Sequence, residues 1–261
     1  MHKPISLTKV THKNKIKMFR KIDSILEKFK YFYHRRNGRA FVAYLRSLGI
    51  TIGENCIFRD PLHTRIDITR PALISIGDNV DINMHFQILT HDWTSHVFKE
   101  VYHDFVNSSG KVEIGNNVYI ATNVSVFKGV RIGNNCIIGG GSVVTRDIPD
   151  NSVAAGVPCK VICSLEEYYQ KRKKQGLAEA VEYVNCFIER FGRQPEPHEM
   201  TEEFIYFVNA DNVEEYEKMG VPVRKQLGTS YASFLNCPPP PLFQSFNEFI
   251  AYCVSHKNYE S

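Results

Sequence analysis

Between residues 112 and 144, aliphatic side chains recur at every sixth position. One row of six positions is wholly aliphatic, and a second row lies two residues before it: Ile114, Ile120, Val126, Ile132, Ile138, Val144, then Val112, Val118, Val124, Val130, Cys136 and Ser142. Eleven of these twelve are apolar, whereas a chain that is 43% apolar would give about five by chance. Two inward residues flanking one outward residue is the alternation of a short strand. The pattern predicts a parallel β-helix, because an amphipathic α-helix would repeat every 3.6 residues.

The residues between the predicted strands are suited to corners. Gly and Asn are frequent at 115–117, 133–135 and 139–141, and both tolerate a positive φ angle better than other residues. The same pairing of inward positions runs upstream from Ile50 to Ile88, with breaks between residues 62 and 70. The coil is therefore expected to span residues 50–163.

The six-residue period is interrupted once. After Ile88 a strict repeat would place the next inward residue at position 94, but it comes only at Ile114, so a segment of about 20 residues must leave the coil as a loop, at about residues 89–111. This loop holds several side chains that are candidates for catalysis or binding: Thr90, His91, Asp92, Trp93 (the single tryptophan), His96, His103 and Asp104. Loops that leave a rigid scaffold often carry function.

Residues 132–149, followed by 154–162, resemble the hexapeptide-repeat acyltransferases. The strongest likeness is to the galactoside and maltose acetyltransferases and to the O-acetyltransferases of capsule and O-antigen synthesis. The resemblance covers roughly residues 50–163. It implies a mainly β fold, a left-handed parallel β-helix, and a homotrimer with active sites between neighbouring subunits.

The resemblance also implies an acetyl-CoA-dependent O-acetyltransferase that acts on a saccharide hydroxyl by direct transfer. Its general base is a histidine at the start of the ejected loop, a position that His91 matches; neutral histidine suits this task because its pKa lies near the operating pH. Either Asp92 or a backbone carbonyl is expected to hold the imidazole tautomer. His63 and His85 are candidates for sugar contact. Trp93 is expected either to stack on a sugar or to anchor the loop in the core.

On the donor side, the resemblance places coenzyme A along the coil, where small side chains leave room for its pantetheine arm. The cofactor-binding residues it implies are Ala121, Thr122, Gly140, Gly141, Thr145, Arg146 and Lys160. Thr122, Thr145 and Arg146 match positions near the pantetheine and nucleotide, and Lys160 matches a basic position that meets the coenzyme phosphates. No metal ligands are expected.

Both flanks of the coil differ from it. Residues 1–39 carry twelve Lys or Arg and two acids, a net charge of +10, whereas the remainder has a net charge of −6. Residues 17–36 resemble a basic amphipathic helix, so 1–49 is expected to be a helical segment that either docks on the coil or contacts anionic lipid. Nucleic-acid binding is disfavoured because no recognition motif accompanies the charge. Residues 164–261 show helical periodicity, clearest at 165–191, and no catalytic motif.

Seven scattered cysteines indicate reduced packing residues of a cytosolic protein. No apolar stretch is long enough to span a bilayer and none resembles a signal peptide, so the expected location is cytoplasmic, at the inner face of the membrane if the basic segment binds lipid.

Alternatives from other functional classes stay open. The gamma-class carbonic anhydrases share the fold and bind zinc with three histidines; His91 and His96 echo that pattern, but no third histidine stands at the expected upstream interval. A membrane-docked trimeric scaffold without activity would have no affinity for acetyl-CoA. The acceptor sugar is not named by the sequence, and N-acetylation of an amino sugar stays open as well.

Overall fold

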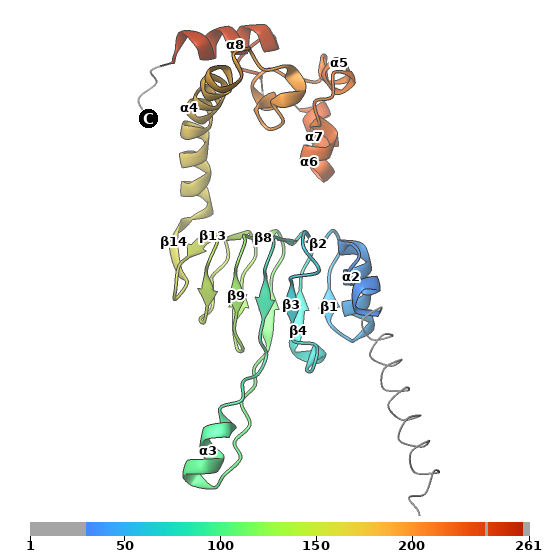
Figure 1. The fold of residues 1–261 in the computed structure, drawn as a ribbon, viewed down its shortest axis with the longest axis vertical. Coiled ribbons are helices and arrows are strands. Elements are labelled where there is room, and N and C mark those ends of the chain that lie inside the picture. The colour runs from blue at the N-terminus through green and yellow to red at the C-terminus, as the bar shows by residue number, and fades with distance from the viewer. Residues whose placement is uncertain (1–29, 238–239, 258–261) are drawn as a thin grey trace, which may run out of the picture. The chain divides into compact units, whose positions relative to one another are not determined.

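The computed structural model describes residues 30–237 and 240–257. The chain divides into two compact units, Met1–Tyr168 and Tyr169–Ser261. The first is a parallel β-helix with a helical segment at its N-terminal end, and the second is helical (Figure 1).

Three sheets form the β-helix, and each coil of the chain adds one strand to each sheet in turn. Sheet A contains β1 (Thr51–Ile52), β4 (Ile74–Ile76), β7 (Val112–Ile114) and β10 (Arg131–Ile132). Sheet B contains β2 (Ile57–Phe58), β5 (Asp81–Ile82), β8 (Val118–Ile120), β11 (Cys136–Ile138), β13 (Ser152–Ala155) and β14 (Lys160–Ser164), the last antiparallel. Sheet C contains β3 (Arg65–Ile66), β6 (Gln87–Ile88), β9 (Ser125–Val126) and β12 (Val143–Val144). The predicted parallel β-helix is confirmed.

The strand register reproduces the period found in the sequence. Cys136 lies opposite Val118, and the coils here repeat at an interval of 18 residues, the length of three hexapeptides. Ile74 lies opposite Val112, where the interval grows to 38 residues, so the passage from the second coil to the third holds the predicted insertion. The inserted residues form an arm that carries α3 (Ser95–Tyr102) and projects from the coil in Figure 1.

The twelve positions of the repeat all point inward, with no side chain more than 3% exposed. The first coil departs from the expected phase. Leu62 and Ile68, which follow the six-residue count, are each 41% exposed, and Ile66 is buried in their place. The reason is the length of the turns: Thr51 lies opposite Ser75 at an interval of 24 residues, so the first coil is longer than the regular coils that follow the arm.

The corner between sheets A and B explains the frequency of asparagine. Five asparagines there have φ angles of +54° to +57°: Asn55, Asn79, Asn117, Asn135 and Asn151. The side-chain amide of each of the first four donates to the next asparagine of the row at 2.9–3.1 Å, which forms a ladder along the coil. The adjacent glycines are needed because coils approach closely; a Cβ on Gly115 would lie 2.7 Å from the Gly133 backbone.

The N-terminal end of the coil is covered by α2 (Gly38–Ser47), which begins at the N-cap residue Asn37. Phe41 and Leu45 of this helix are buried in the core of the β-helix. Arg35 is also buried, and its guanidinium donates to the carbonyl oxygens of Pro61 and Thr64. Of the helix predicted over 17–36, residues 30–34 are helical, and residues 17–29 lie outside the described residues.

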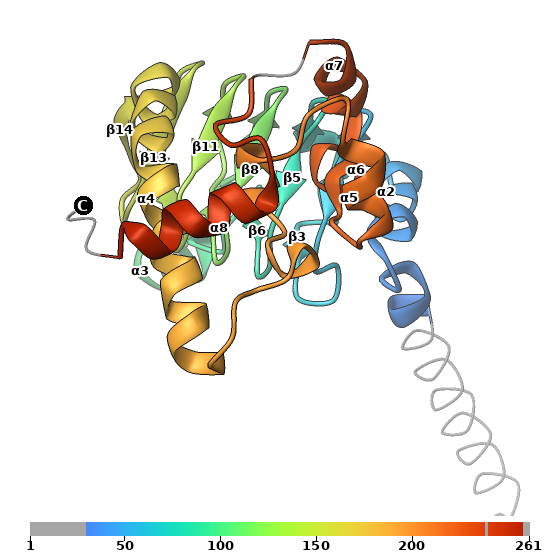
Figure 2. The same cartoon turned by 90° about the horizontal axis from the view of Figure 1, so that it is seen from above.

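The second unit has a core of its own, rich in phenylalanine. Its elements are α4 (Leu165–Phe191, which starts in the first unit), η2 (Pro197–Glu199), η3 (Glu203–Tyr206), α5 (Val213–Lys218), α6 (Val223–Leu227), η4 (Gly228–Ser230), α7 (Tyr231–Asn236) and α8 (Phe246–Ser255). Figure 2 shows α8 crossing α4, where the Asn185 amide donates to the Cys253 carbonyl oxygen at 2.8 Å. Across the described residues, no helix has the length and apolar character needed to cross a membrane.

Candidate functional site

His91 lies where the arm leaves the coil. It follows β6 and forms an antiparallel bridge with Ser109 on the returning strand. The Asp92 amide donates to the Ser108 carbonyl oxygen at 3.2 Å, and the Gly110 amide donates to the Thr90 carbonyl oxygen at 2.9 Å. The arm therefore begins as a two-stranded ribbon of residues 90–92 and 108–110, which we call the stem. Backbone pairing in the stem holds the position of the imidazole.

A buried carboxylate orients that imidazole. Nδ1 of His91 lies 2.6 Å from Oδ2 of Asp67, a residue that follows β3 on the first coil. The Asp67 side chain is 5% exposed and that of His91 is 32% exposed. Asp67 also accepts hydrogen bonds from the amide and hydroxyl of Thr90, at 3.2 and 2.5 Å, and of Thr69, at 3.2 and 2.6 Å.

These donors decide the charge state of Asp67. Burial alone raises the pKa of a carboxyl group, but the hydrogen bonds from Thr69, Thr90 and His91 outweigh burial and hold the pKa of Asp67 well below its usual range. Asp67 is thus an ionised acceptor at neutral pH. It selects the imidazole tautomer with hydrogen on Nδ1, in which Nε2 carries a lone pair.

The prediction that Asp92 or a backbone carbonyl fixes the tautomer of His91 is wrong, because Asp67 does so. Neighbouring side chains on an extended strand point to opposite sides, so Asp92 faces away from His91. Its carboxylate accepts instead from the Lys128 ammonium and from the Ser108 hydroxyl. The Lys128 ammonium is the main reason that the pKa of Asp92 lies well below its usual range.

Most of the other predicted site residues lie along the edge where the chain passes from sheet B to sheet C, which we call the B–C edge. The rings of His63 and His85 are 5.1 Å apart there, and Nδ1 of His63 lies 2.7 Å from Asp60. On the later coils this edge carries Ala121, Thr122, Gly140 and Gly141, and the Gly141 amide donates to the Thr122 carbonyl oxygen at 2.9 Å. A Cβ on Gly140 would lie 3.3 Å from that same oxygen. Small residues therefore line this part of the edge.

The remaining predicted residues lie elsewhere. Thr145 and Arg146 are exposed and follow β12 on the edge between sheets C and A, the C–A edge that also carries Asp67 and His91. Lys160 is exposed and begins β14, opposite Ala155. Gly140 precedes β12 and Arg146 follows it, so the two residues lie at opposite ends of this strand. Sheet C thus separates the two groups of predicted site residues within one chain.

Trp93 is not a core anchor. It lies on the arm, two residues beyond His91, and is 62% exposed. Its ring meets that of Phe105 edge to face, with centroids 5.8 Å apart, and the Lys99 ammonium lies 5.7 Å from its centroid. Val97 and Val101 of α3 are exposed as well. The arm consequently presents apolar side chains to solvent.

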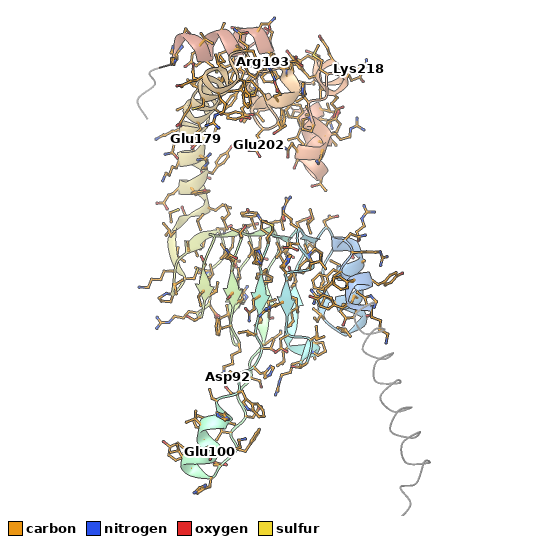
Figure 3. All side chains as sticks on the ribbon, in the orientation of Figure 1. Asp92, Glu100, Glu179, Arg193, Glu202 and Lys218 are labelled. Atoms are coloured by element: carbon orange, nitrogen blue, oxygen red, sulfur yellow. The ribbon has the colours of Figure 1, made fainter. Side chains whose placement is uncertain are left out.

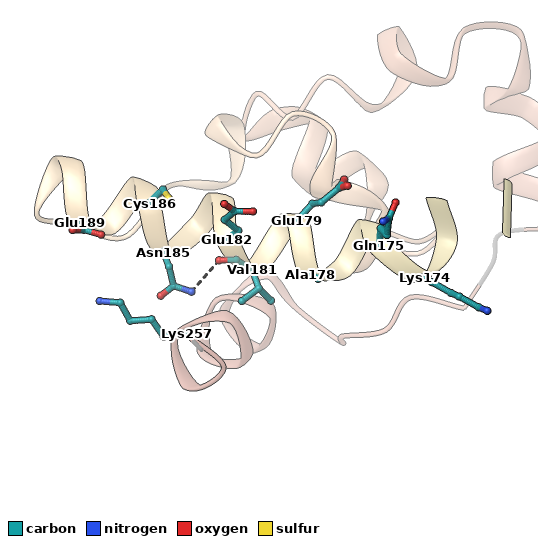
Figure 4. A pocket seen from close by; sticks show the side chains of 10 residues that line it. All are labelled: Lys174, Gln175, Ala178, Glu179, Val181, Glu182, Asn185, Cys186, Glu189 and Lys257. Atoms are coloured by element: carbon teal, nitrogen blue, oxygen red, sulfur yellow. Dashed lines mark hydrogen bonds between the residues drawn. The ribbon is translucent and has the colours of Figure 1, made fainter. Parts of the chain in front are cut away.

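The helical unit contains a cavity of about 640 Å³ that holds none of the predicted residues (Figure 4). It is lined by Lys174, Gln175, Ala178, Glu179, Val181, Glu182, Asn185, Cys186 and Glu189 of α4, and by Lys257. No cluster of three or more His, Cys, Asp or Glu side chains suited to a metal ion occurs within residues 30–237 and 240–257.

Comparisons with known proteins agree with this geometry. The family model for bacterial transferase hexapeptide (six repeats) matches residues 111–146. The chain is 34% identical over 152 residues to galactoside O-acetyltransferase of Escherichia coli (strain K12). That alignment covers 50% of this chain and 73% of the relative. The chain is 39% identical over 127 residues to protein CapG of Staphylococcus aureus, covering 49% of this chain and 73% of that protein.

Solved structures also match part of this chain. A galactoside acetyltransferase in complex with coenzyme A is 28% identical with a TM-score of 0.39, covering 54% of this chain and 80% of the other. A maltose O-acetyltransferase from Clostridium difficile 630 is 37% identical with a TM-score of 0.34, covering 44% of this chain and 58% of the other. From the hexapeptide match and the extent of identity to its relatives, we conclude that this chain belongs to the hexapeptide-repeat acyltransferase family.

Proposed function

We propose that this chain, wound as a left-handed β-helix, transfers the acetyl group of acetyl-CoA to a hydroxyl of a saccharide, with His91 as the general base. The observation that carries the proposal is the hydrogen-bond geometry where the arm leaves the coil: Nδ1 of His91 lies 2.6 Å from Oδ2 of buried Asp67. The acceptor class is supported by the relative named galactoside O-acetyltransferase.

The chemistry follows from the tautomer. Nε2 of His91 takes the proton of the acceptor hydroxyl while that oxygen attacks the thioester carbonyl carbon. The carbon–sulfur bond then breaks, and the proton on Nε2 passes to the departing thiolate. Asp67 stabilises the imidazolium that exists between these two transfers, as a carboxylate does in a catalytic triad. No acyl-enzyme is formed.

The site needs two copies of the chain. The small residues proposed to make room for the pantetheine arm, Ala121 and Gly140, lie on the B–C edge, and His91 lies on the opposite edge of sheet C. An active site assembled from the C–A edge of one subunit and the B–C edge of a neighbour brings them together. The exposed apolar side chains of the arm, among them Trp93 and Val97, support contact with another copy, and the proposed assembly is a homotrimer. His63 and His85, on the B–C edge, would face the acceptor.

The experiment is a screen of saccharides and nucleotide sugars with acetyl-CoA, read by thiol release, followed by His91→Ala with the best acceptor. The substitution should lower kcat by roughly 10²–10⁴ and leave KM for acetyl-CoA nearly unchanged. His96→Ala is the matched control, because His96 is an exposed histidine of the same arm. A His91→Ala variant that keeps most of its activity would overturn the assignment of the base.

The N-terminal segment supports a second proposal, peripheral contact with an anionic bilayer. Residues 1–39 have a net charge of +10, and Tyr31, Phe32 and Tyr33 are 46–60% exposed. Each cationic residue near an anionic surface contributes on the order of 1 kcal/mol, and aromatic rings favour the headgroup region. Deletion of residues 1–29, which spares the buried Arg35, should abolish sedimentation with phosphatidylglycerol vesicles at low salt. Intact protein that ignores such vesicles would refute this contact.

A further inference from the structure

One ammonium group of the coil bonds to both strands of the stem. Lys128 follows β9 on the C–A edge, and its Nζ donates to Oδ2 of Asp92 on the outgoing strand and to Oγ of Ser108 on the returning strand. Ser108 Oγ in turn donates to Asp92 Oδ2 at 3.0 Å. We call these three side chains the stem clamp. Asp92 lies where the arm leaves the coil, and Glu100 lies out on α3 (Figure 3).

The clamp lies next to the proposed base. Asp92 is the residue after His91, and Ser108 precedes Ser109, the bridge partner of His91. Any rotation of the stem therefore moves the His91 peptide relative to Asp67, which is fixed on the first coil. The Lys128 and Asp92 side chains are 31% and 39% exposed, so solvent screens their attraction only in part.

Beyond the stem, most of helix α3 is exposed. In α3 the buried residue is Ser95, which hydrogen-bonds within the arm to Val106. Val97, Val101 and Tyr102 are 57–71% exposed, so they do not pack on the coil of their own chain. Within the described parts of the chain, the charged pairs between arm and coil are His91–Asp67, Lys128–Asp92 and, at the foot of the arm, Lys111–Glu113. Thr90 also donates to Asp67 at 3.2 and 2.5 Å, but on the outgoing strand alone, and the Arg70–Asn107 hydrogen bond is long, at 3.5 Å.

From this arrangement we infer that Lys128 is a positioning residue for the proposed acetyl transfer: it fixes the stem so that His91 keeps its alignment with Asp67 and with the acceptor. The inference rests on the proposed role of His91. A cation is needed because Asp92 and Ser108 Oγ both present acceptor oxygens to this point, and an ammonium can donate to both at once. Displacement of a catalytic group by about 1 Å can lower the rate by about 100-fold.

The test uses Lys128→Met, which keeps the length of the side chain and removes the charge. Lys128→Met should lower kcat by about 10- to 100-fold and change KM for acetyl-CoA by less than about twofold, since misalignment of the base affects the chemical step. Lys128→Arg, which restores donors to both partners, should recover kcat to within about fivefold of the wild type. The matched control is Lys111→Met, because Lys111 is an exposed lysine at the foot of the arm that pairs with Glu113 on its own strand. It should leave kcat unchanged.

Hydrogen exchange supplies a readout that does not depend on activity. In Lys128→Met the amides of Asp92 and Gly110, which donate across the stem, should exchange at least about tenfold faster. The amide of Ala121, which pairs within the coil, should not change. Unaltered stem exchange, or a kcat within twofold of the wild type, would refute the clamp. If His91→Ala is inactive and Lys128→Met has normal activity, the positioning role of Lys128 is refuted and the role of His91 stands. If His91→Ala is active, the role of His91 as general base is refuted, and the positioning role that rests on it is refuted too.

Discussion

Asp67→Asn tests the orientation of His91 with the least change of shape. In the wild type, Oδ1 of Asp67 accepts from Thr69, and Oδ2 accepts from Thr90 and from Nδ1 of His91. The amide oxygen of an asparagine can keep the two bonds from Thr69. Its amide nitrogen then faces Thr90 and His91, where it donates and cannot accept.

The size of the effect follows from this reversal. With a donor opposite Nδ1, His91 takes the tautomer with hydrogen on Nε2, which cannot accept the proton of the acceptor hydroxyl. Regaining the active tautomer gives up one hydrogen bond of about 0.5–1.5 kcal/mol and sets two donors against each other, at about 1–3 kcal/mol. These two terms together are about 1.5–4.5 kcal/mol, and at about 1.4 kcal/mol per tenfold change they lower kcat by roughly 10–10³. The lost stabilisation of the imidazolium lowers kcat further.

The assay is thiol release at saturating acetyl-CoA, combined with nitrogen NMR of the imidazole to identify its tautomer. Asp60→Asn is the matched control, because it alters the same kind of pair at His63 and should change at most KM for the acceptor. The Thr90 amide loses its acceptor in Asp67→Asn, which lowers the free energy of unfolding by about 1–3 kcal/mol. A folded variant with kcat within fivefold of the wild type and an Nδ1-protonated imidazole would refute the reasoning.

Three further predictions concern stability and the donor. The folded-state pKa of Asp67 lies below its ordinary value of 3.8, so its contribution to stability is complete above that pH and is lost as pH falls through the folded-state pKa. Below about pH 4 the free energy of unfolding should therefore fall more steeply with pH in the wild type than in Asp67→Asn. Identical slopes would contradict this. Gly140→Phe should abolish acetyl-CoA binding by calorimetry with an unchanged circular dichroism spectrum, while Gly140→Ala binds; normal affinity in the phenylalanine variant would count against a channel at the B–C edge. Asn117→Ala removes two bonds of the asparagine ladder at a φ of +56° and should lower Tm by about 2–8 °C, more than Asn117→Gly does; equal losses would show that φ is unimportant there.

The coil and its one large interruption are evident from the sequence. Inward and outward positions alternate within each short strand, and Gly and Asn supply the corners, so both signals are local. Counting along the chain from Ile88 to Ile114 is then enough to find the arm, and the register of Ile74 with Val112 confirms the insertion. His91 is evident as a candidate for the same reason, since it is the first imidazole after the interruption.

The partners of His91 depended on the tertiary structure. Asp67 lies 24 residues upstream, in a first coil whose longer turns break the six-residue count, so no period places it beneath the arm. Lys128 reaches Asp92 from the third coil, 36 residues away, through a side chain on an edge that the repeat leaves unconstrained. From the sequence alone, Asp92 is the expected partner of the His91 imidazole because it is the next residue. In the folded chain its side chain points to the other side of the strand.

The placement of the predicted site residues on two edges of sheet C also depends on the tertiary structure. The repeat determines which side chains point inward, because burial of apolar groups drives that choice along every strand. It does not determine which outward residues come together, because that depends on how many residues each turn contains and on how the coils stack. Gly140 and His91 therefore share a predicted function in the sequence but lie on opposite edges of sheet C in the folded chain.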